Sequence, residues 1–319
     1  MTARTGRPWG YWTRIKLGVL SDYLEAFVQA SSRQPERVYL DAFAGEGTGL
    51  DRLTGEEFAG SARIALEVSE PGFTRLRFFE KGRRAAELES RLRADYPGRD
   101  IEVFEGDCNE TIPSALASLR PLRWAPTFAF LDPDGMELRW DTLRALSEHK
   151  HGYRPPGSVK PEYKVELWML FPSGGLVRTL AHDQPLSQRD EERATHLFGD
   201  EAWRTIYDRR RAGLVKGGEA REEYVNLMRW RLERELDYRW THSLELKNLR
   251  GVPLYHMIFA TDNDAGTRIM EHVYRKAAAT EPAMRREAAD RARGQIALDL
   301  GVDPSDATYL YEPPWEPTK

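Results

Sequence analysis

Short apolar runs alternate with amphipathic segments over the first half of the chain. Such runs are typical of strands covered on both faces, whereas apolar residues spaced three and four apart indicate helices. Predicted strands span 38–43, 76–80, 101–104, 127–131 and 165–171. Predicted helices span 13–30, 61–68, 83–95, 110–119 and 140–149. Because strands and helices alternate, we expect a parallel sheet with helices on its faces.

The pattern changes after the fifth predicted strand. Residues 176–236 favour helices punctuated by glycines, and they predict a helical insert that caps the ligand crevice of the sheet. The apolar segments 238–246 and 254–261 flank Asn-Leu-Arg-Gly, which is typical of a hairpin loop. A helix over 264–279, a polar helix over 282–299 and an extended Pro-rich tail follow.

These elements predict an α/β fold. Its Rossmann-like sheet has seven strands, is mostly parallel, and ends in a C-terminal antiparallel hairpin. Residues 1–175 and 237–280 form this domain, residues 176–236 form the helical insert after strand five, and residues 281–319 form a C-terminal helix and tail.

The composition is that of a soluble globular protein. The 319 residues contain 47 Lys and Arg against 51 Asp and Glu, and the net charge of −4 excludes a classical basic nucleic-acid-binding domain. The single cysteine, Cys108, excludes internal disulfides and cysteine-based metal sites, so we expect a cytoplasmic protein. No apolar run approaches the roughly 20 residues of a membrane span, so we expect no membrane contact. We also predict no metal, because His149-Lys-His151 precedes a strand, at the edge opposite the crevice.

A glycine-rich turn follows the first predicted strand. It reads Asp41-Ala-Phe43-Ala-Gly45-Glu-Gly47-Thr-Gly49, and glycines let a backbone turn sharply and approach a ligand closely. A P-loop is excluded because no Gly-Lys-Ser or Gly-Lys-Thr follows. A dinucleotide fingerprint places its acid about 20 residues further on, and Glu80 comes later than that. The acid at the strand end favours a cationic ligand instead.

Acidic residues end the next three predicted strands. Glu80 ends the second, where a carboxylate can accept both ribose hydroxyls; the alternative is a solvated charge. Asp107 ends the third, where it can take an adenine amino group or cap the following helix. Asp132 and Pro133 end the fourth, as part of a stiff turn. Asp132 can orient an acceptor nitrogen or accept its proton, although a plain turn is the alternative.

Pieces of sequence over residues 9–275 resemble the three-Cys-motif partner protein family, which has a fold like that of class I S-adenosylmethionine-dependent methyltransferases. They include Trp12-Thr-Arg-Ile-Lys16-Leu, Tyr39-Leu-Asp41-Ala-Phe43-Ala-Gly45, Gly106-Asp107-Cys-Asn109 and Phe130-Leu-Asp132-Pro133-Asp-Gly135. The chain departs from the family at Glu46, where a Gly-Pro-Gly type of loop is usual, and at Asp134, where an aromatic residue or proline is common.

The resemblance implies a cofactor, a reaction and a partner. The cofactor is S-adenosylmethionine, held at its amino end by Asp41, at its ribose by Glu80 and near its adenine by Asp107. Phe43, Gly45 and Gly47 complete its predicted site. The reaction is methyl transfer to a nucleic acid or a modified nucleotide, with Asp132 and Pro133 at the catalytic position. The alternatives are an accessory binding subunit that works with a three-Cys-motif, radical-S-adenosylmethionine-like protein, and a nicotinamide oxidoreductase.

A basic and aromatic window within the insert is a candidate nucleic-acid contact. Five basic residues there face a single acid, Asp208. They are Arg204, Arg209, Arg210, Arg211 and Lys216. Basic side chains interleaved with aromatic rings can grip a phosphate backbone and stack bases. The alternatives are a solvated helix face and a docking site for a protein partner.

Overall fold

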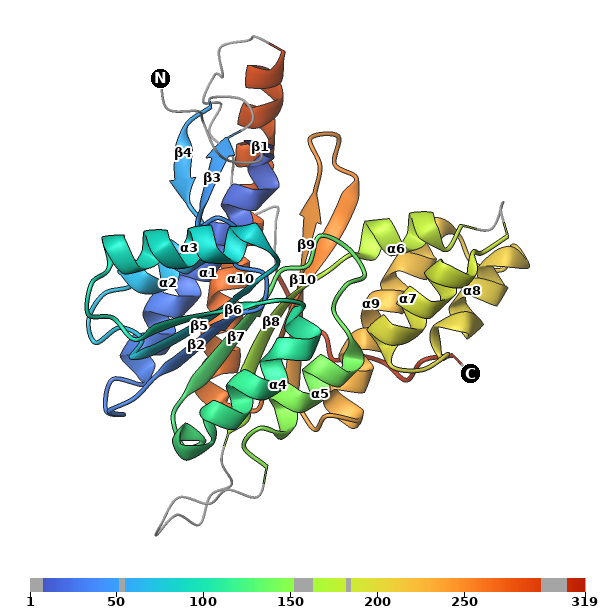
Figure 1. The fold of residues 1–319 in the computed structure, drawn as a ribbon. Helices are drawn as coiled ribbons and strands as arrows, with labels where there is room; N and C mark the ends of the chain where they lie inside the picture. The colour runs from blue at the N-terminus through green and yellow to red at the C-terminus, as the bar shows by residue number, and fades with distance from the viewer. Residues whose placement is uncertain (1–7, 52–54, 152–162, 182–184, 294–308, 319) are drawn as a thin grey trace.

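A seven-stranded sheet forms the centre of the fold, which the computed structural model describes for residues 8–51, 55–151, 163–181, 185–293 and 309–318 (Figure 1). Its strands are β2 (Val38–Asp41), β5 (Arg75–Glu80), β6 (Ile101–Glu105), β7 (Thr127–Leu131), β8 (Glu166–Phe171), β9 (Trp240–Lys247) and β10 (Pro253–Thr261). They lie in the order β6-β5-β2-β7-β8-β10-β9. Strand β10 is antiparallel to β8 and β9, and the other adjacent pairs are parallel. The predicted mixed sheet is confirmed.

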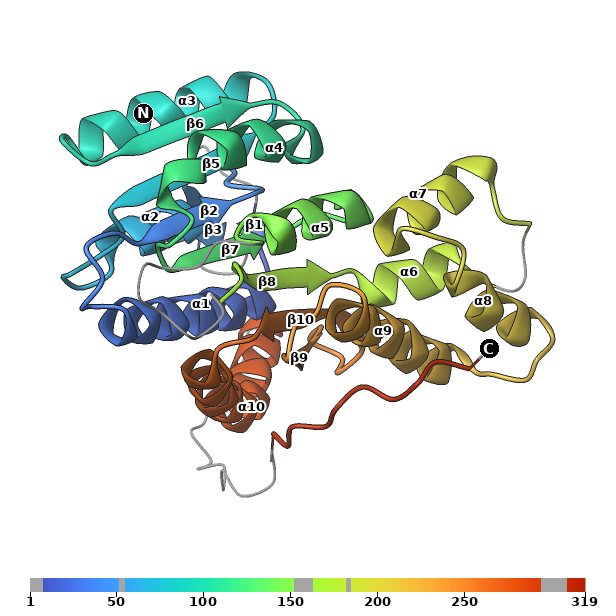
Figure 2. The same ribbon diagram turned by 90° about the horizontal axis from the view of Figure 1, so that it is seen from below.

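Helices cover both faces of this sheet (Figure 2). One face carries α1 (Tyr11–Ala30), α2 (Ser61–Glu67), α3 (Arg83–Asp95) and α10 (Asp264–Ala292). The other carries α4 (Cys108–Ser118), which a 3₁₀ helix at Arg120–Leu122 follows, and α5 (Trp140–Glu148). The helical insert consists of α6 (Ser173–Thr179), α7 (Gln188–Phe198), α8 (Trp203–Arg211) and α9 (Gly217–Arg234). Its helix α6 follows closely on the end of β8 and begins three residues before the predicted boundary at residue 176.

The central strands are apolar at most positions because each strand supplies two separate cores. Side chains alternate between the faces of a strand. Tyr39, Phe128 and Phe130 therefore pack under α1 and α10, whereas Leu40 and Leu131 pack under α4, α5 and the insert. The insert shares the second core with the sheet and has no separate core of its own.

Helix α10 corrects one sequence prediction. We expected two helices, over 264–279 and 282–299, with a break before Pro282. A single helix instead continues through Pro282 to Ala292, and residues 294–299 lie outside the described part. Tertiary contacts hold the helix on both sides of the proline, because Tyr11 donates a hydrogen bond to Glu281 (2.9 Å) and Ala288 is buried.

A small second sheet was not predicted. It consists of β1 (Pro8–Trp9), β3 (Thr48–Asp51) and β4 (Glu57–Ala59), where β3 pairs in parallel with β1 and antiparallel with β4. Strands this short show no clear alternation of apolar and polar residues. The sheet extends the glycine-rich turn into a ribbon that projects beside the start of α1 (Figure 1).

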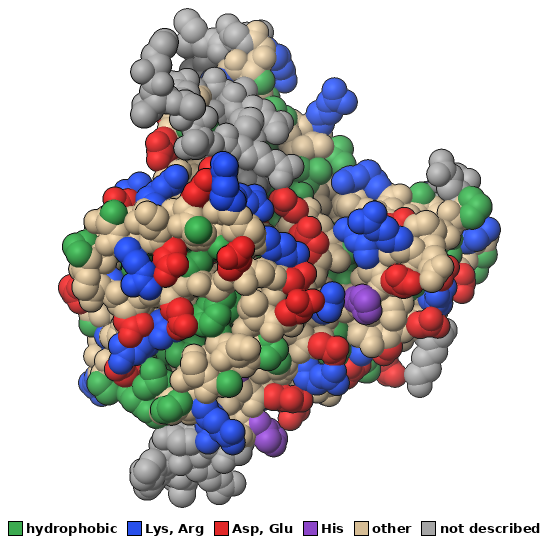
Figure 3. All heavy atoms as spheres, viewed as in Figure 1, with side chains coloured by type: hydrophobic (Ala, Val, Ile, Leu, Met, Phe, Trp, Pro, Cys, Tyr) green, Lys and Arg blue, Asp and Glu red, His purple; other side chains and the backbone are tan. Residues whose placement is uncertain are grey.

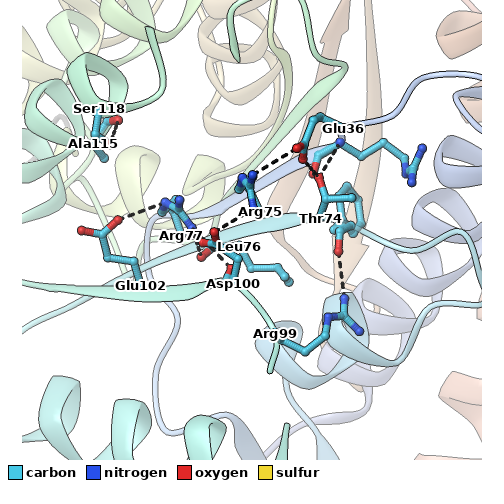
Figure 4. A network of polar contacts seen from close by, with 12 residues as sticks. Glu36, Thr74, Arg75, Leu76, Arg77, Arg99, Asp100, Glu102, Ala115 and Ser118 are labelled. Atoms are coloured by element: carbon cyan, nitrogen blue, oxygen red, sulfur yellow. Dashed lines mark hydrogen bonds and ion pairs between the residues drawn. The ribbon is translucent and has the colours of Figure 1, made fainter. Parts of the chain in front are cut away.

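A charged network ties β5 to β6 at their amino ends (Figure 4). Arg75 pairs with Glu36 (3.1 Å) and Asp100 (2.8 Å). Arg77 pairs with Asp100 (2.7 Å) and with Glu102 (3.1 Å), which lies directly opposite it on β6. These charges pair with one another at the edge opposite the predicted site. We therefore assign them to sheet stability.

The end of the chain docks on the body. The backbone N–H of Trp315 donates to the Asn226 side chain on α9 (2.9 Å), which donates back to the Trp315 carbonyl (2.8 Å). Arg229 donates to the carbonyl of Glu312, and Tyr309 shares a hydrogen bond with His242 on β9 (2.8 Å). The sequence left open whether this tail docks. Figure 2 shows it running along α9.

Candidate functional site

A cavity of about 200 Å³ lies at the carboxyl ends of β2, β5, β6 and β7. From β2, the next two strands along the chain, β5 and β6, lie on one side, and β7 and the later strands lie on the other. The strand order therefore reverses beside β2. Ligands of open α/β sheets bind at such a reversal. The predicted residues that line the cavity are Phe43, Gly45, Gly47, Glu80 and Asp132.

The glycine-rich turn forms one wall of the cavity. Gly45 and Gly47 have φ values of 62° and 76°, a region that residues with a Cβ rarely adopt. Gly60 precedes α2 and donates its N–H to the Gly47 carbonyl (2.9 Å). A Cβ on Gly60 would lie 2.9 Å from that same carbonyl group. The turn therefore rests closely against the start of α2.

Glu80 organises this wall from the end of β5. Its Oε2 accepts the N–H of Gly45 (2.7 Å), and its Oε1 accepts the N–H of Lys81 (2.9 Å) and pairs with Arg84 (2.8 Å). The side chain is only 8% exposed. Glu80 thus connects the glycine turn to β5 while it faces the cavity, as its predicted position requires.

Asp41 lies beneath the cavity and is absent from its wall. We expected its carboxylate to hold the amino end of a cofactor. It is instead fully buried, where it accepts hydrogen bonds from Tyr39 (3.2 Å) and from the backbone N–H of Phe43 (3.4 Å). Burial raises the pKa of Asp41 to about 7, opposed by a hydrogen bond from Ser61. Asp41 therefore holds the turn from behind and does not line the cavity in this structure.

Asp107 takes the alternative role that the sequence allowed. It caps α4, because its Oδ1 accepts the N–H of Asn109 (2.9 Å), and its Oδ2 pairs with Lys81 (2.9 Å). Burial opposes the charge of Asp107, but the bonds from Lys81 and Asn109 outweigh it, and the pKa is lowered. The cavity wall here consists of Gly106 and Cys108. Burial raises the pKa of the Cys108 thiol to about 12, so this thiol is held in its protonated, unreactive form.

Asn109 holds the loop that follows β7. Its amide donates to the Glu137 carbonyl (2.9 Å), and its oxygen accepts from the N–H of Arg139 (2.9 Å) and the hydroxyl of Thr142 (2.7 Å). Asn109 thereby fixes the turn that carries Asp132 and Pro133. Pro133 is buried in that turn and does not line the cavity.

Asp132 forms an ion pair with Lys16, a residue that sequence reasoning missed. Lys16 comes from α1 and is only 3% exposed, with its ammonium near the ring of Phe130. The sequence contained a clue to this role, because Lys16 lies on the same face of α1 as the buried residues Leu20 and Tyr23. A charged residue on such a face requires a buried partner.

The polar lining favours a cation. Its acidic residues outnumber its basic ones, which are Lys16, Lys81 and Arg84. The acidic ones are Glu46, Glu80, Asp132, Asp134 and Glu137. The hydroxyl of Thr13, one turn before Lys16, also lines the cavity, is buried, and has no hydrogen-bond partner among the residues that the structure describes. A buried polar atom in this state is an available contact for a ligand.

The helical insert lies beside the cavity and does not cap it, in contrast to our expectation. None of the lining residues belongs to 176–236. The insert instead packs onto the sheet core, where Phe198 of α7 contacts both Phe171 of β8 and Tyr224 of α9, each with ring centroids 6.0 Å apart. Burying these aromatic rings draws the insert onto the end of β8.

The basic window is largely engaged within the protein. Arg204 pairs with Glu191 (3.0 Å), Arg209 pairs with Glu223 (2.6 Å), and Arg210 donates to the carbonyls of Val177 and Leu180. Arg211 lies over the ring of Tyr207, and the backbone of Lys216 is bonded to Glu219 at the start of α9. Figure 3 shows acidic and basic side chains interspersed over this face. These contacts favour the solvated helix face that the sequence offered as an alternative.

Comparisons with known proteins add little. No family model and no curated protein matches the chain. Among solved structures, the chain is similar to protein LPL1258 from Legionella pneumophila, a DUF519 protein, with a TM-score of 0.47 and 11% identity over 83% of this chain and 91% of that one. A similarity of this size carries no argument about function. The resemblance to the three-Cys-motif partner family therefore stays a prediction. Among the described helices, none is both long and apolar enough to cross a membrane.

Proposed function

We propose that the protein binds S-adenosylmethionine in the cavity beside β2 and transfers its methyl group. The observation that carries this proposal is the glycine turn of β2, held by Glu80 of β5 at the point where the strand order reverses. Counted along the chain, the first five strands of the large sheet lie in the Rossmann order 3-2-1-4-5. The excess of acidic side chains in the lining suits a sulfonium cation better than a pyrophosphate.

Each lining residue has a defined part in this proposal. The Oε2 of Glu80 accepts one bond within the protein, so it has capacity for a ribose hydroxyl. Gly45 and Gly47 let the backbone approach the cofactor, and Phe43 packs beside it. The hydroxyl of Thr13, which has no partner within the described part of the chain, is available to the amino-acid end of the cofactor. Asp41 and Asp107 position these groups from behind.

Asp132 is the residue that orients the methyl acceptor in this proposal. It faces the cavity from the end of β7, and Pro133 stiffens its turn. The acceptor class we propose is a nucleic acid or a modified nucleotide. The arginines of α8 are engaged within the protein, which argues against their binding a nucleic-acid phosphate backbone. We therefore propose that the acceptor enters beside Asp134, which is exposed at the cavity.

A second candidate function is an accessory binding subunit that works with a three-Cys-motif, radical-S-adenosylmethionine-like partner. The Lys16–Asp132 ion pair favours this candidate, because the ammonium already engages the carboxylate that would orient a methyl acceptor. Asp134 supports it as well, since an exposed carboxylate offers no ring for stacking a base. Both candidates require the same cofactor site.

Calorimetry with S-adenosylmethionine, S-adenosylhomocysteine and NAD tests the cofactor site. We expect both adenosyl sulfur ligands to bind and NAD not to bind. Glu80→Ala should weaken binding by about 1.5–3 kcal/mol, the usual value of hydrogen bonds to a charged group. Glu89→Ala is the matched control, because it also removes a glutamate paired with an arginine four residues away, but on the exposed side of α3.

The outcomes separate the possibilities. Heat with NAD and none with the sulfur ligands would favour a nicotinamide enzyme. Absence of heat with all three ligands, on folded protein, would remove the proposal. Binding without methyl transfer to any nucleic-acid fraction would leave the accessory subunit ahead.

A further inference from the structure

Three potential metal ligands converge where the β9–β10 hairpin meets α9. His256 of β10 lies directly opposite Glu245 of β9, so both side chains project from the same face of the sheet. Glu222 of α9 lies over that face, with an oxygen 4.0 Å from His256 Nε2. One ligand atom from each residue lies within 4.8 Å of the other two. None of the three residues lines the cavity beside β2.

The ring of His256 is held in place through Nδ1, which leaves Nε2 for a ligand. Its ring is only 5% exposed, and Nδ1 shares a hydrogen bond with the hydroxyl of Ser173 (2.8 Å). Among the described residues, Nε2 has no hydrogen bond, and it faces the carboxylate of Glu222. A histidine that binds a metal through one nitrogen typically has its other nitrogen fixed in this way.

The charges around the three residues keep the imidazole neutral. Burial, together with the charges of Arg221, Arg229 and Lys247, lowers the pKa of His256 to about 3. Burial and the nearby charge of Glu245 raise the pKa of Glu222. Lys247 pairs with Oε1 of Glu245 (2.9 Å), which leaves Oε2 for another partner. Two carboxylates thus meet the imidazole, and Lys247 and Arg221 offset part of their charge.

We propose that His256, Glu222 and Glu245 bind a divalent transition-metal ion of the Zn²⁺ type. One imidazole nitrogen and two carboxylate oxygens match the ligands of zinc sites that keep a fourth position for water. Tetrahedral coordination brings ligand atoms to about 3.3 Å from one another, so the side chains of Glu222 and Glu245 close onto the fixed histidine. Glu222, which is 53% exposed, is free to move. It also lines a cavity of about 130 Å³ beneath the C-terminal tail, which has room for the water.

Calorimetry on the full-length, chelator-treated and tag-free protein tests this site with ZnCl₂. We expect one Zn²⁺ per chain, and a thermal midpoint that rises with Zn²⁺. Glu222→Gln should weaken binding at least about tenfold, and Ser173→Ala should weaken it by about 10–100-fold, as losses of supporting contacts do. His256→Ala should abolish binding, but Glu222→Gln is the decisive variant because its exposed position keeps the fold intact.

The control removes two histidines that lie close together in sequence but outside the proposed site. His149→Gln/His151→Gln should leave Zn²⁺ affinity unchanged, because both residues lie at the end of α5 and outside the cluster. Equal affinity for the wild type and Glu222→Gln would overturn the proposal. Loss of binding in the His149/His151 variant would also overturn it, and so would the absence of any binding at micromolar Zn²⁺.

Discussion

Three ionisable side chains in and beneath the cavity, Asp41, Lys16 and Asp132, interact electrostatically. Asp41 is fully buried, and the neighbouring charge of Asp132 adds to the effect of burial in raising its pKa. Lys16, itself buried, pairs with Asp132 and offsets part of that charge. Changing any one of them alters the charge that the others experience. The polar floor of the site therefore acts as a unit and not as separate residues.

The Lys16–Asp132 pair gives a prediction at this scale. Asp132→Asn should leave the affinity for S-adenosylmethionine within about threefold, or roughly 0.7 kcal/mol, and abolish methyl transfer. It should also lower the free energy of unfolding by about 1.5–3 kcal/mol, because the ammonium of Lys16 loses its charged partner. Urea denaturation measures the stability, and calorimetry measures the affinity.

The double variant Asp132→Asn/Lys16→Met controls for the Lys16 charge, which loses its Asp132 partner in the single variant. Replacing both members of a buried pair is often neutral, so it should be more stable than Asp132→Asn alone. A parallel loss of cofactor affinity in Asp132→Asn would assign Asp132 to cofactor binding. No change in stability would mean that the pair contributes nothing to the fold.

At the scale of elements, the cavity depends on how closely the turn after β2 approaches α2. Gly60 begins α2 with φ of −77°, a value that any residue adopts, so backbone strain does not explain the glycine. Lack of space does, because a Cβ on Gly60 would lie 2.9 Å from the carbonyl group of Gly47. The contact sets the distance between the glycine-rich turn and α2.

Gly60→Ala tests that contact. The added methyl should push the turn away from α2, lowering both the thermal midpoint and the affinity for S-adenosylmethionine. Gly18→Ala is the matched control, since Gly18 lies on the exposed side of α1 with no heavy atom within 4 Å of its Cβ position. It should raise stability by about 0.5–1 kcal/mol through helix propensity. Unchanged affinity in Gly60→Ala would show that the turn tolerates displacement.

The large elements were predictable because their sequence pattern and their burial coincide. Strand β7 and helix α3 have the predicted bounds, since β7 is a nearly continuous apolar run and α3 repeats its apolar residues at helical spacing. The continuation of α10 through Pro282 was not predictable, because it rests on a contact with Tyr11 about 270 residues away in sequence. The pairing of β1 with β3 likewise depends on two distant segments.

The site was predictable in position and less so in detail. Strand ends correctly placed Gly45, Glu80 and Asp132 around one cavity. The sequence could not tell that Asp41 points beneath the turn, because burial of a strand-end carboxylate depends on what packs over it. Lys16 was missed because its partner, Asp132, is distant in sequence and close only after α1 packs on the sheet.

At the scale of the whole molecule, the C-terminal tail fastens the insert to the hairpin. Tyr309 reaches His242 on β9, and Trp315 reaches Asn226 on α9, so residues 309–318 bridge two elements that carry the proposed metal ligands. Asn226 is only 2% exposed, so its amide depends on the tail for its partners. The tail thus contributes to stability through α9 as well as through its own contacts.

Asn226→Ala tests this coupling in two chain lengths. In the full chain it removes two hydrogen bonds and should cost about 1–3 kcal/mol at 0.5–1.5 kcal/mol each. A chain that ends at residue 308 lacks Trp315, so the Asn226 amide has already lost both of these hydrogen bonds. The same substitution should then cost less than about 0.5 kcal/mol. Asn263→Ala, which removes the cap of α10, should cost about 1 kcal/mol in both lengths. Urea denaturation measures all four differences, and an equal cost of Asn226→Ala in both lengths would mean that the tail does not dock there in solution.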